Sequence, residues 1–327
     1  MTIENLKSNA NMNRLESLKR LGLNKSRYYK YMRERHQRNE YQPGQRFNIN
    51  RILEEEKKQV ISYALNHTEY RYREMTYRMI DESIAFLSKS SVYRILKGSE
   101  LMFPRIIKRR KRTGRTGVWA KKPDECWQVD IMMLWIDGSF YNLLIFMDEY
   151  SRYIVHWKLL QFIDGITLSD NMEEALSKRK SKRIPMIQTD NGSGFIGAEF
   201  KKYINDHSLT HILINPGSPA ENALIERGNR TIREDVEEKE PRTHEKALEV
   251  IRAVIDHYNN ERYHSKLNFI PPVIYYTGNP AKILLERKVK ILEARRNRRE
   301  KNMNLRFRSQ DDKSYPPYYE GQKVHFS

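Results

Sequence analysis

The sequence is poor in the residues that several common kinds of site require. Among its 327 residues there is one cysteine, Cys126. This excludes an internal disulfide and any zinc site built from several cysteines. No stretch matches GxxxxGK[ST], the glycine-rich loop that binds the phosphates of ATP. We also find no convincing Ser–His pair for nucleophilic catalysis, so the chemistry must rest on other groups.

Long hydrophobic runs are also lacking. Runs such as Ile131–Ile136 and Leu143–Met147 are far shorter than the roughly 20 residues of a membrane helix. The N-terminus, Met1–Glu4, lacks the basic-then-apolar pattern of a secretion signal. Hydrophobic residues still make up 39% of the chain, which is enough for a sizeable core. We expect a soluble intracellular protein of two or three domains.

Positive charge is abundant and unevenly placed. The chain holds 60 Lys and Arg against 42 Asp and Glu, a formal net charge of +18. Residues 1–120 carry +15, residues 121–280 carry −4 and residues 281–327 carry +7. Basic arms on both sides of a slightly acidic middle suit the neutralisation of nucleic-acid phosphates. A solvated basic surface is the alternative.

Two helical regions precede the middle of the chain. Residues 13–38, within a first segment 1–45, have the pattern of a helix–turn–helix. A second helical unit over 46–103 ends in a short helix, Val92–Lys97, which Ser88–Ser91 can cap. Tyr93 and Arg94 on that helix suit a recognition helix in the major groove of DNA. An ordinary small helical domain explains the pattern equally well.

A basic linker over 104–122 follows. It contains seven basic residues between Arg105 and Arg115 and no acidic one. Such a run is usually a solvated linker, but between two domains it can lie along a phosphate backbone.

The pattern changes to α/β over 123–277. A three-strand meander with a turn at Asp137-Gly138, followed by alternating helices and strands, predicts a mixed sheet with helices on both faces. The expected strands are Trp127–Ile136, Phe140–Met147, Arg152–Leu160, Ile184–Thr189 and Leu209–Ile214; the expected helices are Leu168–Lys178, Gly197–His207, Glu221–Glu238 and Thr243–Asn259. A basic helix, roughly Ala281–Arg299, then leads into an irregular tail within the last segment, 278–327.

Three acidic residues stand out from the rest. Asp130 lies inside a strand that is apolar on both faces, where a lone carboxylate is unfavourable unless it is paired or bound to a cation. Asp190 ends a later strand and opens a flexible loop, Asn191–Gly194, at the edge of the sheet where ligands usually bind. Glu226 shares a helix face with Asn222, Asn229, Arg230 and Arg233. Structural hydrogen bonding, turn capping and a solvated face are the alternatives for the three.

Three converging carboxylates would repel one another, and divalent cations relieve that repulsion. Hard oxygen ligands favour magnesium or manganese over zinc. Two such ions roughly 4 Å apart can activate an attacking oxygen and stabilise a leaving oxygen on one phosphate. The pattern therefore points to phosphodiester chemistry.

At this point the motifs resemble a known family. They are similar to the integrase-type catalytic core of DDE transposases, those of bacterial insertion sequences related to retroviral integrases. Asp190 and Glu226 are separated by 35 residues, the spacing of that family. The residues that carry the resemblance are Trp127-Gln128-Val129-Asp130, Thr189-Asp190-Asn191-Gly192-Ser193, Asn215 to Glu226, Tyr258 to His264 with Pro271-Pro272, and, upstream, Tyr70 to Arg73 and Val92 to Leu96. Gly194 departs from the family, which often has Gln there.

The resemblance implies a ribonuclease-H-like fold and a polynucleotidyl transferase that cleaves DNA ends and transfers strands with Mg²⁺ or Mn²⁺. It places Asp130, Asp190 and Glu226 at the metal-binding positions, and Arg230 and Arg233 where such enzymes contact the transposon end. It further implies double-stranded DNA as partner, a homodimer or larger assembly on DNA, and a bacterial, nucleoid-associated protein of the cytoplasm. The residues that we predict to contact DNA are Asn191, Asn222, Arg230, Arg233, Tyr93, Arg94, Arg109, Arg110, Lys111, Arg112 and Arg115.

Two other functions remain open on the sequence. One is a domesticated or inactive relative that acts as a DNA-binding regulator. The other is a nuclease or resolvase on the same fold, which would cleave branched DNA without joining it. Transposition by end cleavage and strand transfer is our leading hypothesis because all three acidic residues are present.

Overall fold

The computed structural model describes residues 48–102, 120–215 and 219–311, together with Leu18, Ser26 and Tyr29. The described residues divide into two compact units, Glu54–Glu293 and the described parts of Met1–Leu53 and Ala294–Ser327. The predicted helix–turn–helix, apart from the three single residues, and the basic run over 105–115 lie outside the described residues. No helix in the described part of the chain is long and apolar enough to cross a membrane.

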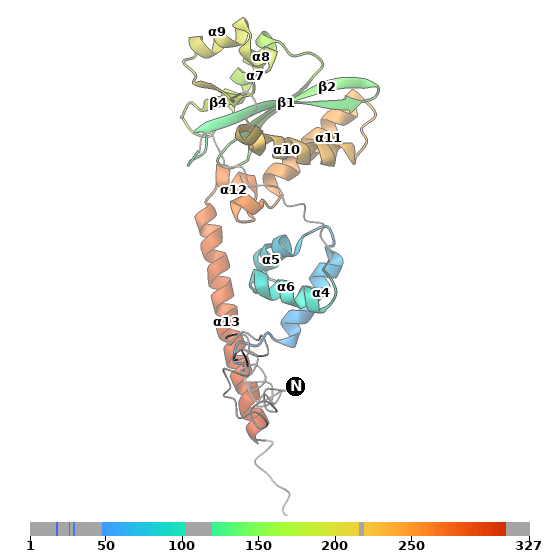
Figure 1. The fold of residues 1–327 in the computed structure, drawn as a ribbon, viewed down its shortest axis with the longest axis vertical. Helices are drawn as coiled ribbons and strands as arrows, with labels where there is room; N and C mark the ends of the chain where they lie inside the picture. The colour runs from blue at the N-terminus through green and yellow to red at the C-terminus, as the bar shows by residue number, and fades with distance from the viewer. Residues whose placement is uncertain are drawn as a thin grey trace, which may run out of the picture. The chain divides into compact units, whose positions relative to one another are not determined.

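A five-stranded mixed sheet forms the centre of the larger unit (Figure 1). The turn between the first two strands uses Asp137 and Gly138, whose φ angles are +47° and +75°, as a two-residue hairpin turn with positive φ at both positions requires. The predicted mixed sheet is confirmed, with no strand end shifted by more than two residues. The strands are β1 (Cys126–Ile136), β2 (Ser139–Asp148), β3 (Ile154–Leu160), β4 (Met186–Thr189) and β5 (His211–Leu213), in the spatial order β3-β2-β1-β4-β5.

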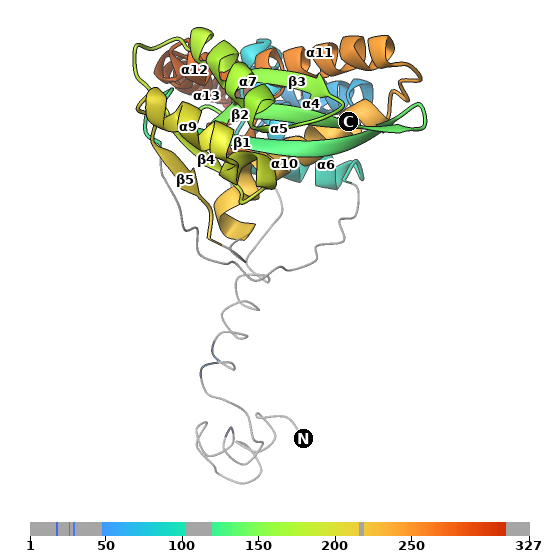
Figure 2. The same ribbon diagram turned by 90° about the horizontal axis from the view of Figure 1, so that it is seen from above.

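Helices cover both faces of this sheet (Figures 1 and 2). On one face Trp127 and Val129 of β1 are buried in a cluster with Phe195 and Phe200. On the other face Met132, Leu134 and Ile136 pack with apolar residues of two long helices. The first face is covered by α7 (Gly165–Ser177), α8 (Ser193–Ile196) and α9 (Ala198–Asp206), and the second by α10 (Pro219–Glu237) and α11 (His244–Asn260).

Three short helices precede the sheet in the same unit: α4 (Glu54–Asn66), α5 (Tyr72–Asp81) and α6 (Lys89–Gly98). Val60, Met79 and Val92, each at most 1% exposed, lie in the apolar interior of this helical region. The predicted cap is confirmed, because Ser88 Oγ accepts a hydrogen bond from Ser91 N at 3.2 Å. The helices exist as predicted, and their binding to DNA stays a prediction.

The segment after α11 closes the unit. It contains the turn η1 (Ser265–Leu267), the helix α12 (Pro272–Tyr276) and the long helix α13 (Pro280–Asp311). Arg287 of α13 donates to both carboxylate oxygens of Asp81 in α5, at 2.7 and 2.6 Å, and to the carbonyls of Asn268 and Phe269. This buried guanidinium ties α13 to α5 and to the turn after η1. In the smaller unit, Asn302 Nδ2 donates to the carbonyls of Ile49 and Arg51.

Three sequence expectations are wrong. The loop after Asp190 is not wholly irregular, because the short helix α8 begins at Ser193. The outer half of β1 is not buried on both faces: Met133 and Trp135 are 63% and 61% exposed, since the hairpin extends past the helices on that face (Figure 2). The C-terminal helix does not end near Arg299, because α13 continues to Asp311.

Candidate active site

Asp130 and Asp190 come from adjacent parallel strands. β1 pairs with β4 through Trp127 with Ile187 and Gln128 with Gln188. Two residues beyond the last of these pairs, the same register sets Asp130 level with Asp190. Since side chains alternate along a strand, Asp130 lies on the face of β1 that carries Gln128, and Asp190 directly follows β4, the strand of Gln188.

The two glutamines fix the helix that carries the third acidic residue. Gln128 Nε2 and Gln188 Nε2 both donate to the carbonyl of Glu221, at 3.4 and 3.0 Å. Gln128 Oε1 accepts from Ile225 N at 3.2 Å. The first turns of α10 are thereby held over β1 and β4, and Glu226 is the next residue along the helix.

The electrostatics of Asp130 show that the three carboxylates interact. The pKa of Asp130 is raised to about 6, mainly by burial and next by the negative charge of Asp190, with Glu226 adding a smaller effect. Asn229, one turn after Glu226, donates from Nδ2 to Asp130 Oδ2 at 2.6 Å and opposes that rise. A carboxyl group surrounded in this way favours either a proton or a cation.

Asp190 is held by its own loop. Its Oδ1 accepts from Gly192 N at 3.0 Å. A Cβ at position 192 would lie 3.0 Å from the same oxygen, so glycine lets the loop turn tightly around the carboxylate. Asp190 is partly buried, whereas Glu226 is exposed on α10.

The carboxylate and amide oxygens of this site are chemically suited to a divalent cation, but they are not arranged as a complete set of ligands. Within the described ranges, no three His, Cys, Asp or Glu side chains stand close enough together to hold a metal ion. Three buried amide oxygens nevertheless lack a hydrogen-bond partner there, those of Gln188, Asn222 and Asn229. Buried polar atoms are normally satisfied. Of the three residues, Asn229 contacts Asp130, so an amide oxygen of the kind that hard cations accept as a ligand belongs to a residue bonded to the acidic site.

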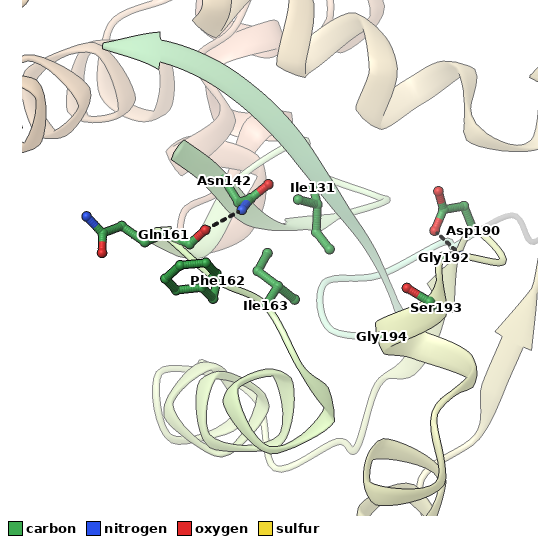
Figure 3. A pocket seen from close by; sticks show the side chains of 9 residues that line it. All are labelled: Ile131, Asn142, Gln161, Phe162, Ile163, Asp190, Gly192, Ser193 and Gly194. Atoms are coloured by element: carbon green, nitrogen blue, oxygen red, sulfur yellow. Dashed lines mark hydrogen bonds between the residues drawn. The ribbon is translucent and has the colours of Figure 1, made fainter. Parts of the chain in front are cut away.

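A pocket of about 380 Å³ adjoins Asp190 (Figure 3). Ile131, Phe162 and Ile163 form its apolar wall, and Asn142 Nδ2 donates to the carbonyl of Gln161 at 3.0 Å on its polar side. The pocket's remaining lining residues are Asp190, Gly192, Ser193 and Gly194. A Cβ at position 194 would lie 2.8 Å from Leu168 Cδ1, so a larger residue there would require Leu168 to shift.

The residues predicted to contact DNA have varied surroundings. Arg230 and Arg233 are exposed on α10, one and two turns after Glu226. Asn191 is exposed and donates to the carbonyl of Ile214 at 2.9 Å, whereas Asn222 is only 5% exposed. Tyr93 packs at 5.4 Å from the ring of Tyr72, and Arg94 donates to the carbonyl of Ser90. Arg109, Arg110, Lys111, Arg112 and Arg115 lie outside the described residues.

Sequence reasoning missed the supporting role of three residues. Gln128 and Gln188 each stand two positions before an aspartate, and Asn229 stands three after Glu226. Those offsets put a polar side chain on the same strand face or helix face as the acid, a signal that was available in the sequence. Their hydrogen bonds show that they position the acidic residues.

The site lies in a part of the chain that matches known families. Residues 120–219 and residues 207–272 match two families, each described as an integrase core domain. Asp130 and Asp190 fall in the first match and Glu226 in the second.

Individual relatives are distant. A protein described as an uncharacterized 39.2 kDa protein of insertion element IS476 from Xanthomonas euvesicatoria is 27% identical over 65% of this chain and 62% of its own length. Transposase InsF for insertion sequence IS3A from Escherichia coli is 24% identical over 50% of this chain and 57% of its own. The chain thus spans less than two thirds of the length of these two relatives.

Among solved structures, the HTLV-2 integrase catalytic core domain in complex with magnesium superposes with a TM-score of 0.41 at 17% identity. The superposition covers 48% of this chain and 99% of that one.

Proposed function

This chain contains an integrase core domain related to those of insertion-sequence transposases, and from that premise we propose that it is a DDE-type transposase. It cleaves DNA at the ends of a mobile element and joins those ends to target DNA. The observation that carries the proposal is the register of β1 and β4, which sets Asp130 level with Asp190 under the helix that bears Glu226.

Asp130, Asp190 and Glu226 are the proposed ligands of two Mg²⁺ or Mn²⁺ ions. Such a pair supplies Lewis-acid stabilisation of the attacking and leaving oxygens of one phosphate. The protein's part is to hold the carboxylates in place: Asn229 keeps Oδ2 of Asp130 oriented, and Gly192 N–H keeps Oδ1 of Asp190 oriented.

The proposed substrate is double-stranded DNA. Arg230 and Arg233 extend from the carboxylate site along α10 and suit phosphates of the element end. The strongly basic residues 1–120 supply further phosphate contacts and bind the ends. Because two ends must be held together, the protein acts as a homodimer or larger assembly on DNA, in the cytoplasm at the nucleoid.

Substitution of Asp190 by Asn tests the proposal. D190N removes a ligand charge and keeps the shape, so we expect normal binding of end DNA and a loss of strand transfer of about a thousandfold or more. D170N, at an exposed position of α7, is the matched control and should join DNA normally.

Three results would contradict the proposal. Normal joining by D190N would remove the metal assignment. Cleavage of branched DNA without joining by the unaltered protein would indicate a nuclease or resolvase. End binding without metal-dependent nicking would indicate a regulator.

A further inference from the structure

Helix α13 has an exposed apolar face that the proposed function does not use. Leu285, Val289 and Leu292 are 62%, 42% and 50% exposed. The opposite face of the helix is anchored by Arg287 and also by Lys290, whose Nζ donates to the carbonyl of Ile80 at 3.1 Å. Leu285 and Val289 are each two residues from Arg287, about 200° around the helix. The anchor therefore turns this stripe away from α5.

The stripe has the spacing of a coiled-coil seam. Its members follow one another at intervals of four and three residues, so Val289 takes an a position and Leu285 and Leu292 take d positions. A β-branched residue at a with leucine at d favours two strands. Lys282 and Arg296 occupy the neighbouring a positions and limit the apolar seam to three layers.

The charges beside the seam identify its partner. Lys288 stands at a g position and Glu293 at the e position of the following heptad. In a parallel, in-register pair, g of one helix faces that e of the other, so Lys288 meets Glu293 of a second copy. In an antiparallel pair g faces g and e faces e, which would set lysine against lysine and glutamate against glutamate. Arg295 and Glu300 repeat the pattern one heptad later.

We propose that two copies of this chain associate through a parallel, in-register coiled coil of α13, with its apolar seam over residues 285–292. In this arrangement opposite charges face each other across the two helices, whereas in the antiparallel arrangement like charges would face each other and repel. A seam of three layers is short, so the dimer forms in a concentration-dependent way. This inference rests on the homodimer proposed above and names its contact. Its test needs neither DNA nor metal, so its failure would leave the proposed activity standing.

Disulfide trapping tests the register directly. The single natural cysteine, Cys126, is fully buried, and burial raises the pKa of its thiol, so an added cysteine is the reactive one. In the proposed dimer position 285 meets position 285 of the second copy. L285C should therefore form a covalent dimer under mild oxidation of the full-length protein. L284C is the matched control: it is 37% exposed, lies off the seam, and should remain monomeric in the same assay.

Equal trapping of L284C and L285C would overturn the proposal, and so would the absence of trapping in L285C. Trapping of L285C only when it is mixed with V289C would show an antiparallel pair, in which d faces a, and would overturn it as well.

Charge reversal tests the partner. K288E and E293K should each lose the dimer in sedimentation velocity because each sets like charges across the seam. The double variant K288E/E293K restores opposite charges and should regain the dimer. Failure of the double variant to recover would overturn the arrangement, as would dimers that persist in both single variants. Circular dichroism should be unchanged in all three, since both side chains are exposed.

Discussion

Two aspartates in neighbouring strands of the same sheet have the same raised pKa and opposite surroundings. Asp130 in β1 and Asp148 at the end of β2 both have a pKa of about 6, in each case chiefly because they are buried. Asp148 accepts hydrogen bonds from Asp124 N, Ser151 N and Ser151 Oγ, at 2.6 to 2.9 Å. Asp130 accepts one side-chain hydrogen bond, from Asn229, and has Asp190 and Glu226 as electrostatic neighbours.

The comparison shows that a perturbed pKa alone does not identify a functional acid. The groups that surround the carboxylate distinguish a functional acid from a structural one. Three hydrogen-bond donors, as around Asp148, mean that the carboxylate holds the fold together. Other acids close enough to raise the pKa, as around Asp130, are what our proposal of a bound cation rests on. The predictions below test this distinction, from the largest expected effect to the smallest.

Removal of the Asp148 carboxylate should cause the largest loss of stability. D148A leaves two backbone N–H groups and one hydroxyl buried without their acceptor, and we expect the free energy of unfolding to fall by about 4 kcal/mol. Urea denaturation of the full-length protein measures it. D170A, which removes an exposed acid from α7, should change the free energy by far less. If D148A lost as little free energy of unfolding as D170A, Asp148 would have no structural role and would not differ from Asp130 in that respect.

Removal of the Asp130 charge should have the opposite sign. The folded pKa of about 6 lies above the unfolded value of about 3.9, so the wild-type protein loses stability as the pH rises from about 4 through 6. D130N escapes that loss. In chelator we expect D130N to be more stable than wild type by about 2 kcal/mol at pH 7.5, and equal to it near pH 4. Asp148 titrates in both proteins and cancels in the difference.

Adding Mg²⁺ to the same two proteins tests whether Asp130 binds a metal ion. Mg²⁺ should raise the melting temperature of the wild-type protein at pH 7.5 and leave that of D130N unchanged, because a ligand that binds the folded state stabilises it. A D130N protein that is destabilised in chelator would instead assign Asp130 the same structural role as Asp148.

A smaller effect is expected further into the Asp148 network. Tyr276 OH donates to Asp124 Oδ1 at 2.8 Å, and Trp127 Nε1 donates to the same oxygen at 3.1 Å. Y276F removes one of two donors, so we expect a loss of about 1 kcal/mol in the free energy of unfolding. Phenylalanine keeps the ring that stacks 4.5 Å from the ring of Tyr153, so the variant isolates the hydroxyl. A loss as large as that of D148A would mean that this one hydrogen bond contributes as much as the Asp148 carboxylate.

Much of the core could be predicted from local patterns. The turn at Asp137-Gly138 set the hairpin, and the alternation of apolar residues set which side chains of β1 face α10. The Asp130–Asp190 juxtaposition was expected from strand ends and from resemblance, and the register of β1 and β4 agrees with it.

The Asp148 network could not be predicted in the same way. Its partners are separated by up to 152 positions along the chain, as Tyr276 is from Asp124, and nothing local marks them as neighbours. The exposure of Trp135 was missed for a related reason, because a strand's own sequence does not state how far the covering helices extend. The site was the more predictable part since its residues cluster at strand ends and on one helix.

The pairing of Arg287 with Asp81 has a consequence for how the protein is made. The two residues are 206 positions apart. At roughly 5–20 residues per second of translation, on the order of ten seconds or more separate the emergence of α5 from that of its arginine. The nascent chain therefore passes through a stage in which Asp81 has no guanidinium to bind. A ribosome that stops before codon 287 would release a product fixed permanently in that stage.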